Sequence, residues 1–345
     1  MRYHGGRGDG LDFSVNLNPL PPPPEAAENL SRCLSEEAAG RYPDYEYRDL
    51  REAIRSFYGV DHVVPLNGSS EGILLAALAT RARRLIAVQP TYGEHGDLAE
   101  VLGIRYDSVA MRRGEREFSL DPGALEARCA DPEALIYISN PNNPTGAIVD
   151  PRALGEIASG CRSWILIDEA YAELSDAYPG VRPPEGDRLL VLRSLTKWLS
   201  VPGLRVGFAV APRKVARAMD ALRAPWNVNS VAECFARSSL SGAREALLNH
   251  IIRSRQYVHV ERSKMADRMS SLGLRAFRSA ANFLLVETEG SARPLAERLG
   301  SRGIRIREAW TFEGLDERFF RVAVRSHEDN EVLLRELEVA LHGPR

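Results

Sequence analysis

Short apolar runs alternate with amphipathic stretches over most of the chain. The runs occupy residues 60–66, 84–90, 134–140, 164–170, 188–194 and 205–211, and most of them end in polar or turn residues. Helical patterns lie between several of them. Strands buried on both faces of a sheet give continuous apolar runs, and strands that alternate with helices form parallel sheets. The pattern therefore predicts an α/β fold with a parallel or mostly parallel central sheet.

The pattern changes near Ser241, where a long charged helix is predicted. The segments 281–288 and 319–325 then alternate like the strands of a smaller α+β unit. The N-terminal segment is irregular and contains the proline run 21–24, a stiff extended spacer. We predict an N-terminal segment (1–40) that joins the small domain, a large domain (41–240) and a small C-terminal domain (241–345).

Composition excludes several classes of partner. The chain has 345 residues, of which 44% are hydrophobic and 27% charged, and its formal net charge is -2. This balance favours neither nucleic acid nor a membrane surface. No apolar run approaches the roughly 20 residues of a membrane span, and the first ten residues lack a signal-peptide core. The four cysteines form no CxxC pair, so we expect reduced, mostly buried thiols, a cytoplasmic protein and no metal site.

Two of the predicted strands end in groups suited to hold a heteroaromatic ring. Residues 139–146 read SNPNNPTG, and asparagines held beside prolines present fixed amides. Asp168 follows a buried strand directly, where a carboxylate is costly unless it meets a cation such as a pyridinium nitrogen. Tyr171 could reach the phenolic oxygen of the same ring. An ordinary Asn-Pro turn and a helix N-cap aspartate are the alternative interpretations.

A third predicted strand leads to a lysine. Lys197 follows Ser194 and Thr196, and Arg205 lies eight residues beyond it. A lysine beside hydroxyls and an arginine fits a Schiff-base amine next to a phosphate site, because the guanidinium offers a fixed fork of donors. A surface lysine is the alternative for this residue taken singly.

A glycine turn supplies a possible anion site. Gly68, Ser69 and Ser70 stand between a predicted strand and a predicted helix, where backbone amides and the helix dipole attract anions. A plain glycine turn is the alternative. A nucleotide-binding enzyme would need GxxxxGK[ST] or GxGxxG, and neither occurs. A non-catalytic regulator of the same fold is disfavoured by the presence of Lys197.

Together these motifs resemble the fold-type I enzymes of the class I/II aminotransferase superfamily, nearly end to end. The nearest groups within it are the threonine-phosphate decarboxylases and the histidinol-phosphate aminotransferases, which handle phosphorylated amines. The resemblance implies a large PLP-transferase domain, pyridoxal 5'-phosphate (PLP) as cofactor and a small phosphorylated amino-acid substrate. It also implies a homodimer with shared active sites and an N-terminal segment that covers the site.

The resemblance assigns roles to individual residues. It implies that Lys197 carries PLP as a Schiff base, that Asp168 pairs with the pyridine nitrogen and that Tyr92 stacks on the ring; these three are the predicted catalytic residues. The further predicted cofactor-binding residues are Ser69, Ser70, Asn143, Tyr171, Ser194, Thr196, Arg205 and, from the neighbouring subunit, Tyr42. The predicted substrate-binding residues are His4, Asn16, Asn143, Arg307, Arg321 and Arg325.

Details of the motifs favour the decarboxylase group. The chain opens with HGG followed by LDFSVNLNPL, the lysine motif reads SLTK with VPGLR, FEGLD precedes the last predicted strand, and that strand ends in RVAVRS. We therefore predict PLP-dependent decarboxylation of L-threonine O-3-phosphate to (R)-1-amino-2-propanol phosphate, a step in cobalamin biosynthesis. Histidinol-phosphate aminotransferase, or a related class I/II aminotransferase, is the alternative.

Overall fold

A seven-stranded sheet forms the centre of the fold in the computed structural model, which describes residues 6, 10–34, 40–93, 95–178 and 180–343. Strand β10 is antiparallel to both of its neighbours, and the other neighbouring pairs are parallel. In spatial order the strands are β2 (Val63–Leu66), β10 (Gly207–Val210), β9 (Leu189–Ser194), β8 (Trp164–Asp168), β7 (Ala134–Ser139), β3 (Arg84–Gln89) and β4 (Arg105–Ala110). The predicted α/β class with a mostly parallel central sheet is confirmed.

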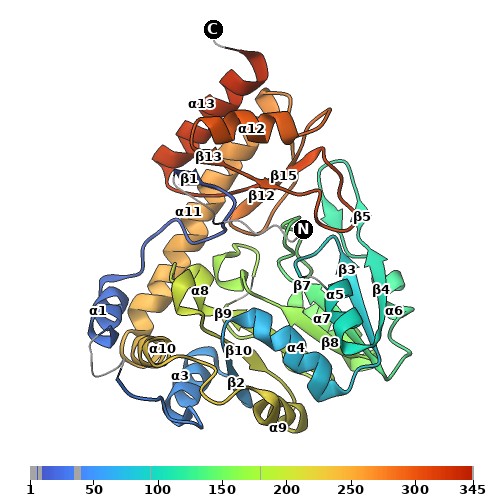
Figure 1. Cartoon of the computed structure of the whole chain (residues 1–345), viewed down its shortest axis with the longest axis vertical. Coiled ribbons are helices and arrows are strands. Elements are labelled where there is room, and N and C mark those ends of the chain that lie inside the picture. The colour runs from blue at the N-terminus through green and yellow to red at the C-terminus, as the bar shows by residue number, and fades with distance from the viewer. Residues whose placement is uncertain (1–5, 7–9, 35–39, 94, 179, 344–345) are drawn as a thin grey trace.

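Helices cover both faces of this sheet, which explains its continuous apolar strands. Leu135 and Leu166 face a core shared with α4, α5 and α9, whereas Ile136 and Ile165 face an opposite core with α6 and α7. A third core packs α1, α3, α8 and α10 against β2 and β10 (Figure 1). These helices are α1 (Pro24–Cys33), α3 (Arg48–Tyr58), α4 (Ser69–Thr80), α5 (His95–Leu102), α6 (Pro122–Glu126), α7 (Pro151–Gly160), α8 (Leu195–Trp198), α9 (Arg213–Leu222) and α10 (Ser230–Gly242).

A second, antiparallel sheet lies at the other end of the molecule (Figure 1). Its strands in spatial order are β11 (Arg275–Ala276), β12 (Phe283–Glu287), β15 (Phe319–Ala323) and β14 (Arg307–Glu308), and it shares a core with α12 (Arg293–Ser301) and α13 (His327–His342). Helix α11 (Arg244–Ser271) is the long charged helix predicted near Ser241. It joins the two parts, because Leu247 packs in the core of the large sheet and Met269 in that of the small one.

The N-terminal segment contacts both parts. Strand β1 (Leu11–Asp12) pairs in parallel with β13 (Ile304–Arg305), beside the small sheet. Further on, the side-chain amide of buried Asn18 donates to the carbonyl oxygen of Trp198 at 2.7 Å and to Oγ of Ser254 at 2.8 Å. The domain limits 1–40, 41–240 and 241–345 stay a prediction, although the seven-stranded and the four-stranded sheet each lie within one of the predicted domains.

The four cysteines form two disulfides, Cys33–Cys234 and Cys129–Cys161. The prediction of reduced thiols is therefore wrong. The partners are 201 and 32 residues apart in the sequence, with Cα atoms 5.7 and 4.6 Å apart. Because packing of α1 against α10 brings the first pair together, local spacing gave no sign of it.

The remaining elements are small. Strands β5 (Arg112–Arg113) and β6 (Phe118–Ser119) form a two-stranded ribbon, and η1 (Ala172–Leu174) and η2 (Pro202–Leu204) are single 3-10 turns.

Within the described ranges, no helix has both the length and the apolar character needed to cross a membrane. The same residues contain no group of three or more His, Cys, Asp or Glu side chains arranged to hold a metal ion.

Candidate active site

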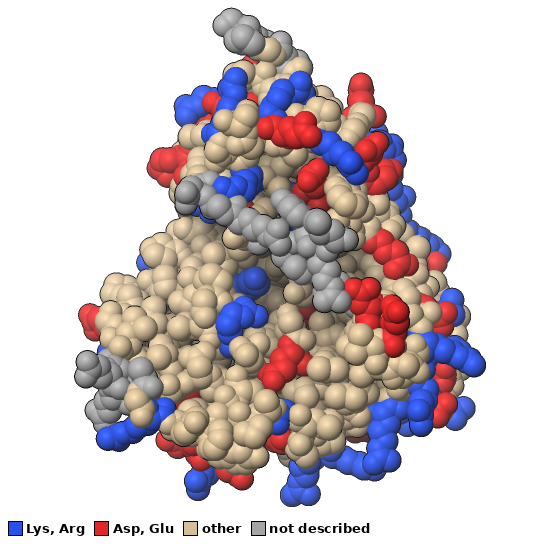
Figure 2. Space-filling model, viewed as in Figure 1, with Lys and Arg blue, Asp and Glu red and all other residues tan. Residues whose placement is uncertain are grey.

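The carboxyl ends of β7, β8 and β9 meet at one edge of the large sheet, where Ser139 lies opposite Asp168 in register and Ser194 ends the next strand. A main cavity of about 490 Å³ and an inner hollow of about 130 Å³ lie at this edge. Figure 2 shows a hollow in the middle of this face of the molecule, with Lys or Arg side chains beside it. The predicted site residues that line the main cavity are Asn16, Tyr92, Asn143, Tyr171, Lys197, Arg307 and Arg321. The inner hollow adds Ser69, Ser70, Asp168, Ser194, Thr196 and Arg205.

The inner hollow contains a helix N-terminus suited to an anion. Helix α4 begins at Ser69, directly after Gly68, whose φ is +74°. A Cβ atom at Gly68 would lie 2.4 Å from a guanidinium nitrogen of Arg205, so the missing side chain lets the arginine reach the turn. The hydroxyls of Ser194 and Thr196 are 2.8 Å apart on the neighbouring segment. Backbone N–H groups, hydroxyls and a guanidinium are the donors that bind phosphate.

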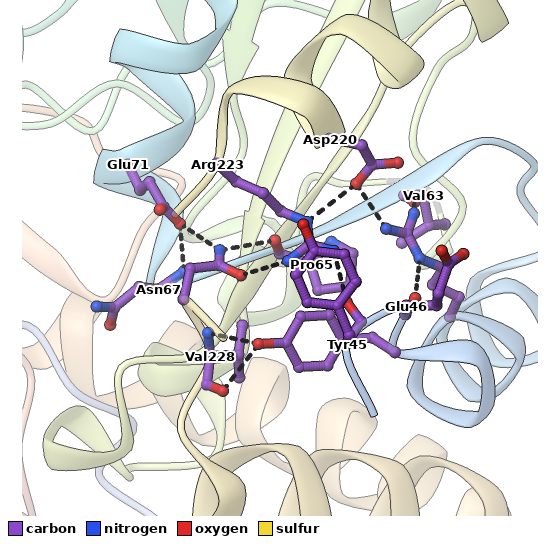
Figure 3. A network of polar contacts seen from close by, with 12 residues as sticks. Tyr45, Glu46, Val63, Pro65, Asn67, Glu71, Asp220, Arg223 and Val228 are labelled. Atoms are coloured by element: carbon purple, nitrogen blue, oxygen red, sulfur yellow. Dashed lines mark hydrogen bonds and ion pairs between the residues drawn. The ribbon is translucent and has the colours of Figure 1, made fainter. Parts of the chain in front are cut away.

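A network of hydrogen bonds fixes this turn from outside (Figure 3). The carboxylate of Glu71 accepts from the backbone N–H of Asn67 at 2.7 Å and from the side-chain amide of Asn227 at 2.8 Å. Arg223 donates to the side-chain oxygen of Asn227 at 3.3 Å and to the carbonyl oxygen of Tyr45 at 2.7 Å. The start of α4 is thereby tied to the segment that carries Tyr45.

Asp168 is buried in the wall of the inner hollow. Its Oδ1 accepts a hydrogen bond from the backbone N–H of Ala170 at 3.1 Å, and its Oδ2 accepts one from the hydroxyl of Tyr137 at 2.9 Å. Burial raises the pKa of Asp168, while these hydrogen bonds and the charge of Lys197 oppose the rise. A cation bound in the hollow would stabilise the ionised carboxylate.

Lys197 is half-buried and lines both the main cavity and the inner hollow. Burial, together with the positive charges of Arg205 and Arg321, lowers the pKa of Lys197 to about 8, against the opposing charge of Asp168. More of this amine is therefore unprotonated at neutral pH than for an ordinary lysine. An unprotonated lysine is a nucleophile for a carbonyl group.

Contacts around the main cavity join three parts of the chain. Arg321 of the small sheet donates to the side-chain oxygen of Asn143 and to the carbonyl oxygen of Ser14, the latter at 2.6 Å. Asn16 of the N-terminal segment donates to the hydroxyl of Tyr171 at 3.4 Å. Burial raises the pKa of Tyr171, so its hydroxyl stays protonated at neutral pH.

Two arginines lie opposite each other on β14 and β15. Arg307 and Arg321 are register partners, and their exposed fractions are 7% and 5%. Burial and, to a smaller extent, the charge of Arg307 lower the pKa of Arg321 to about 10. Like charges placed opposite each other on a sheet repel. An anion in the main cavity would offset this repulsion.

Two of the predicted site residues that the structure describes, Arg325 and Tyr42, are not brought to the cavity of this chain. Arg325 forms an ion pair with Asp329 at 2.9 Å and is not among the residues that line either cavity. Tyr42 is 78% exposed and stacks on Trp226, with ring centroids 4.4 Å apart. His4 lies outside the described residues. The roles predicted for these three residues stay predictions.

The sequence analysis missed a polar wall of the main cavity. The side-chain amide of Gln89 donates to the hydroxyl of Tyr106 at 2.9 Å, and that hydroxyl donates to Glu313 at 2.6 Å. Gln89 is the last residue of strand β3, as Ser139 is of β7 and Ser194 is of β9. A polar residue at the end of an apolar strand is the sequence signal that could have identified it. Glu313 comes from a loop of the small domain, and no local signal connects it to β3.

Comparisons with known proteins agree with this geometry. The sequence profile of the family described as "Aminotransferase class I and II" matches residues 8–337. The chain belongs to this family. Its structure is similar to that of a solved histidinol-phosphate aminotransferase from Clostridium acetobutylicum, with a TM-score of 0.84 and 26% sequence identity. The match covers 97% of this chain and 100% of the solved chain.

Relatives within the family have two different names. The chain is 33% identical to a protein of Caldanaerobacter subterraneus named as a threonine-phosphate decarboxylase, over 93% of this chain and 88% of the relative. It is 32% identical to the threonine-phosphate decarboxylase of Salmonella typhimurium, over 96% of this chain and 92% of the relative. It is 28% identical to a histidinol-phosphate aminotransferase of Ruminiclostridium cellulolyticum, over 95% of this chain and 91% of the relative.

The cofactor of this member of the class I and II aminotransferase family is PLP. The residues present fit it, because the inner hollow combines a buried carboxylate, an anion site at a helix N-terminus and an amine of lowered pKa. The missing Cβ of Gly68, which leaves room for Arg205, is part of the same fit. Both names among the relatives are consistent with this cofactor site, so the choice between two reactions depends on the main cavity.

Proposed function

We propose that this protein decarboxylates L-threonine O-3-phosphate to (R)-1-amino-2-propanol phosphate, a step in cobalamin biosynthesis that takes place in the cytoplasm. The two relatives at 32 and 33% identity that are named for threonine phosphate support this reaction. The observation that carries the proposal is the buried pair Arg307 and Arg321 beside Lys197. Two fixed cations suit a substrate that carries both a phosphate and a carboxylate.

The residues of the inner hollow would hold the cofactor. Ser69, Ser70, Ser194, Thr196 and Arg205 would bind its phosphate, Asp168 its ring nitrogen, and Asn143 with Tyr171 its ring oxygen, while Tyr92 would stack on the ring. Bound PLP supplies an electron sink for the bond that breaks at Cα of the substrate. Lys197 would bind the cofactor and afterwards return a proton to the product carbon.

The arginines of the main cavity would decide which bond breaks. We propose that Arg307 and Arg321 grip the phosphate and the carboxylate, so that the bond from Cα to the carboxylate is the one aligned for cleavage. Asn16 would close the cavity from the N-terminal segment, where it already bonds Tyr171. His4 and Arg325 remain additional candidates for contacts to the substrate anions.

Histidinol-phosphate aminotransferase is the second candidate. A relative of that name is 32% identical, from Chromobacterium violaceum, over 97% of this chain and 94% of the relative. The structure also offers Glu313 and Tyr106 in the wall of the main cavity, oxygen atoms that could accept a hydrogen bond from an imidazole. Both reactions use a phosphorylated amine, so only the assay separates them.

Two parallel assays test the proposal. Purified enzyme loaded with PLP is given L-threonine phosphate, and CO2 and the amino alcohol phosphate are measured. A second sample receives histidinol phosphate and 2-oxoglutarate, and glutamate is measured. We expect turnover in the first assay and at most slow turnover in the second. Activity confined to the second assay would replace the decarboxylase proposal and leave the cofactor assignment intact.

We also propose a homodimer with shared active sites. Helix α4 is apolar around its circumference, as SSEGILLAALAT shows, and such helices are normally buried on all sides. Yet Leu74 and Leu78 are each 40% exposed, and Val101 of the adjacent α5 is 82% exposed. A second copy seated on this surface would cover it. Tyr42 could then reach the cofactor phosphate of the partner.

We predict that Leu78→Glu weakens or abolishes the dimer, because a buried charge without a partner opposes association. The mass of the particle, measured by light scattering across a dilution series, should fall toward that of one chain. Val260→Glu on α11 is the control, since Val260 is a similarly exposed apolar residue, at 47%, on another helix. Unchanged mass for Leu78→Glu would place the dimer contact elsewhere.

A further inference from the structure

Tyr137 is a fully buried tyrosine that the proposed reaction has not yet used. It lies on β7, two residues before Ser139, and Ser139 is the register partner of Asp168 on β8. Side chains alternate along a strand, so Tyr137 and Ser139 project from the same face of the sheet as Asp168. The phenol thus extends along this face and donates its O–H to Oδ2 of Asp168 at 2.9 Å.

The surroundings fix the position of this phenol. The ring of His95 packs on the ring of Tyr137, with centroids 4.1 Å apart. His95 in turn contacts the carbonyl oxygen of Tyr92 through Nε2 at 2.8 Å. Gly93 permits this fold-back, because a Cβ atom there would lie 2.8 Å from Nε2 of His95. The phenol therefore connects the carboxylate of Asp168 with the loop that carries Tyr92.

We propose that Tyr137 is a positioning residue for the cofactor, whose O–H keeps the Asp168 carboxylate ionised and directed at the ring nitrogen of PLP. This inference rests on the role proposed for Asp168. Its physical basis is the balance at the carboxylate: burial favours the protonated acid, and a donated hydrogen bond favours the anion. Burial and the neighbouring Asp168 also raise the pKa of Tyr137 well above its usual value, so the phenol remains a donor at working pH.

Removing one oxygen atom tests this role. In Tyr137→Phe the ring still packs on His95, but Asp168 loses one of its two hydrogen-bond donors. The pKa of the Asp168 carboxyl should therefore rise. Its carboxylate then competes with the ring nitrogen for the proton, and the ring nitrogen is protonated less completely. We expect kcat to fall roughly 10- to 100-fold, the range that corresponds to one hydrogen bond to a charged group.

A spectroscopic readout separates positioning from a structural effect. Loss of positive charge on the ring lets the nitrogen linked to Lys197 keep its proton to a higher pH. The pH midpoint of the visible absorbance of the bound cofactor should therefore rise, by about one unit if the change is tenfold. Replacing Tyr137 with a fluorinated tyrosine, which keeps the phenol and makes it a stronger donor, should shift the midpoint in the opposite direction.

Tyr178→Phe is the matched control. Tyr178 is also buried, and its hydroxyl donates to Glu169, the residue next to Asp168. Unlike Asp168, Glu169 lines neither cavity and is paired with the guanidinium of Arg193 at 2.8 Å. The Tyr178→Phe variant should lose thermal stability without a shift of the absorbance midpoint. If Tyr137→Phe behaves in the same way, with unchanged midpoint and kcat, Tyr137 is only structural and the inference is wrong.

The same measurement on Asp168→Asn tells two failures apart. If that variant shifts the midpoint and Tyr137→Phe does not, the role of Asp168 stands and the role of Tyr137 falls. If neither variant shifts the midpoint, the assignment of Asp168 to the ring nitrogen is wrong, and the inference about Tyr137, which depends on it, is wrong as well. An insoluble Tyr137→Phe protein leaves the fluorinated variant to decide, since it retains the hydrogen bond and the fold; an unmoved midpoint there contradicts the inference.

Discussion

Lys197→Ala is expected to abolish turnover, with a loss of roughly 10³-fold or more in kcat, because in the proposed function this one amine both binds the cofactor covalently and transfers a proton. The lowered pKa of Lys197, about 8, suits both tasks, since the amine can accept and return a proton near neutral pH. The visible absorbance of the bound cofactor should change as well. After reduction with borohydride, mass spectrometry should find the cofactor attached to the wild-type chain and not to the variant.

Lys214→Ala provides the control for this experiment. Lys214 is an exposed lysine on α9, outside both cavities, so its loss should leave kcat and the absorbance unchanged. Wild-type turnover by Lys197→Ala, or borohydride attachment at another lysine, would contradict the assignment of the cofactor to Lys197.

Asp168→Asn is expected to reduce kcat by about 10²- to 10³-fold. A carboxylate about 4 Å from a ring cation is worth roughly 4 kcal/mol at an effective dielectric constant near 20, which is about three pKa units. The amide keeps the shape of the side chain and can still accept hydrogen bonds, but it carries no charge. The ring nitrogen should therefore lose its proton at neutral pH, and the cofactor should withdraw electrons less strongly.

The stability of the cofactor-free protein distinguishes this effect from misfolding. Burial raises the pKa of Asp168 in the folded protein, so ionisation of this group costs stability progressively as the pH rises from the unfolded pKa through the folded one. A neutral amide removes that cost, and we expect Asp168→Asn to be no less stable than wild type at pH 8, while kcat falls. Asp150→Asn, at the N-cap of α7, is the control that should retain full activity. A parallel loss of stability and activity in Asp168→Asn would favour a structural role for Asp168.

Some features were accessible to sequence analysis because they depend on local order along the chain. Apolar runs that end in SNPNNPTG, DEAY and SLTK predicted strands whose polar ends meet, since parallel strands of one sheet share a carboxyl edge. The structure brings Asn143, Asp168 and Lys197 to that edge. The glycine turn before α4 was recognised for the same reason, because a turn between a strand and a helix is a local feature.

Other features could not be found in this way, because they depend on contacts between distant segments. Arg307 and Arg321 become neighbours through the register of β14 and β15, and Arg325, four residues further along, is drawn to Asp329 of α13 instead. Glu313 joins Gln89 only when the small domain packs beside the large sheet.

The sequence by itself determined the fold class and the family, and it singled out Lys197 as the candidate Schiff-base residue, since periodicity and strand-end motifs are written in consecutive residues. Only the tertiary structure decided that Cys33 meets Cys234, that two arginines face one cavity and that Tyr137 donates to Asp168. Such pairings follow from strand register and helix packing, which the whole core sets at once and no short stretch of residues encodes.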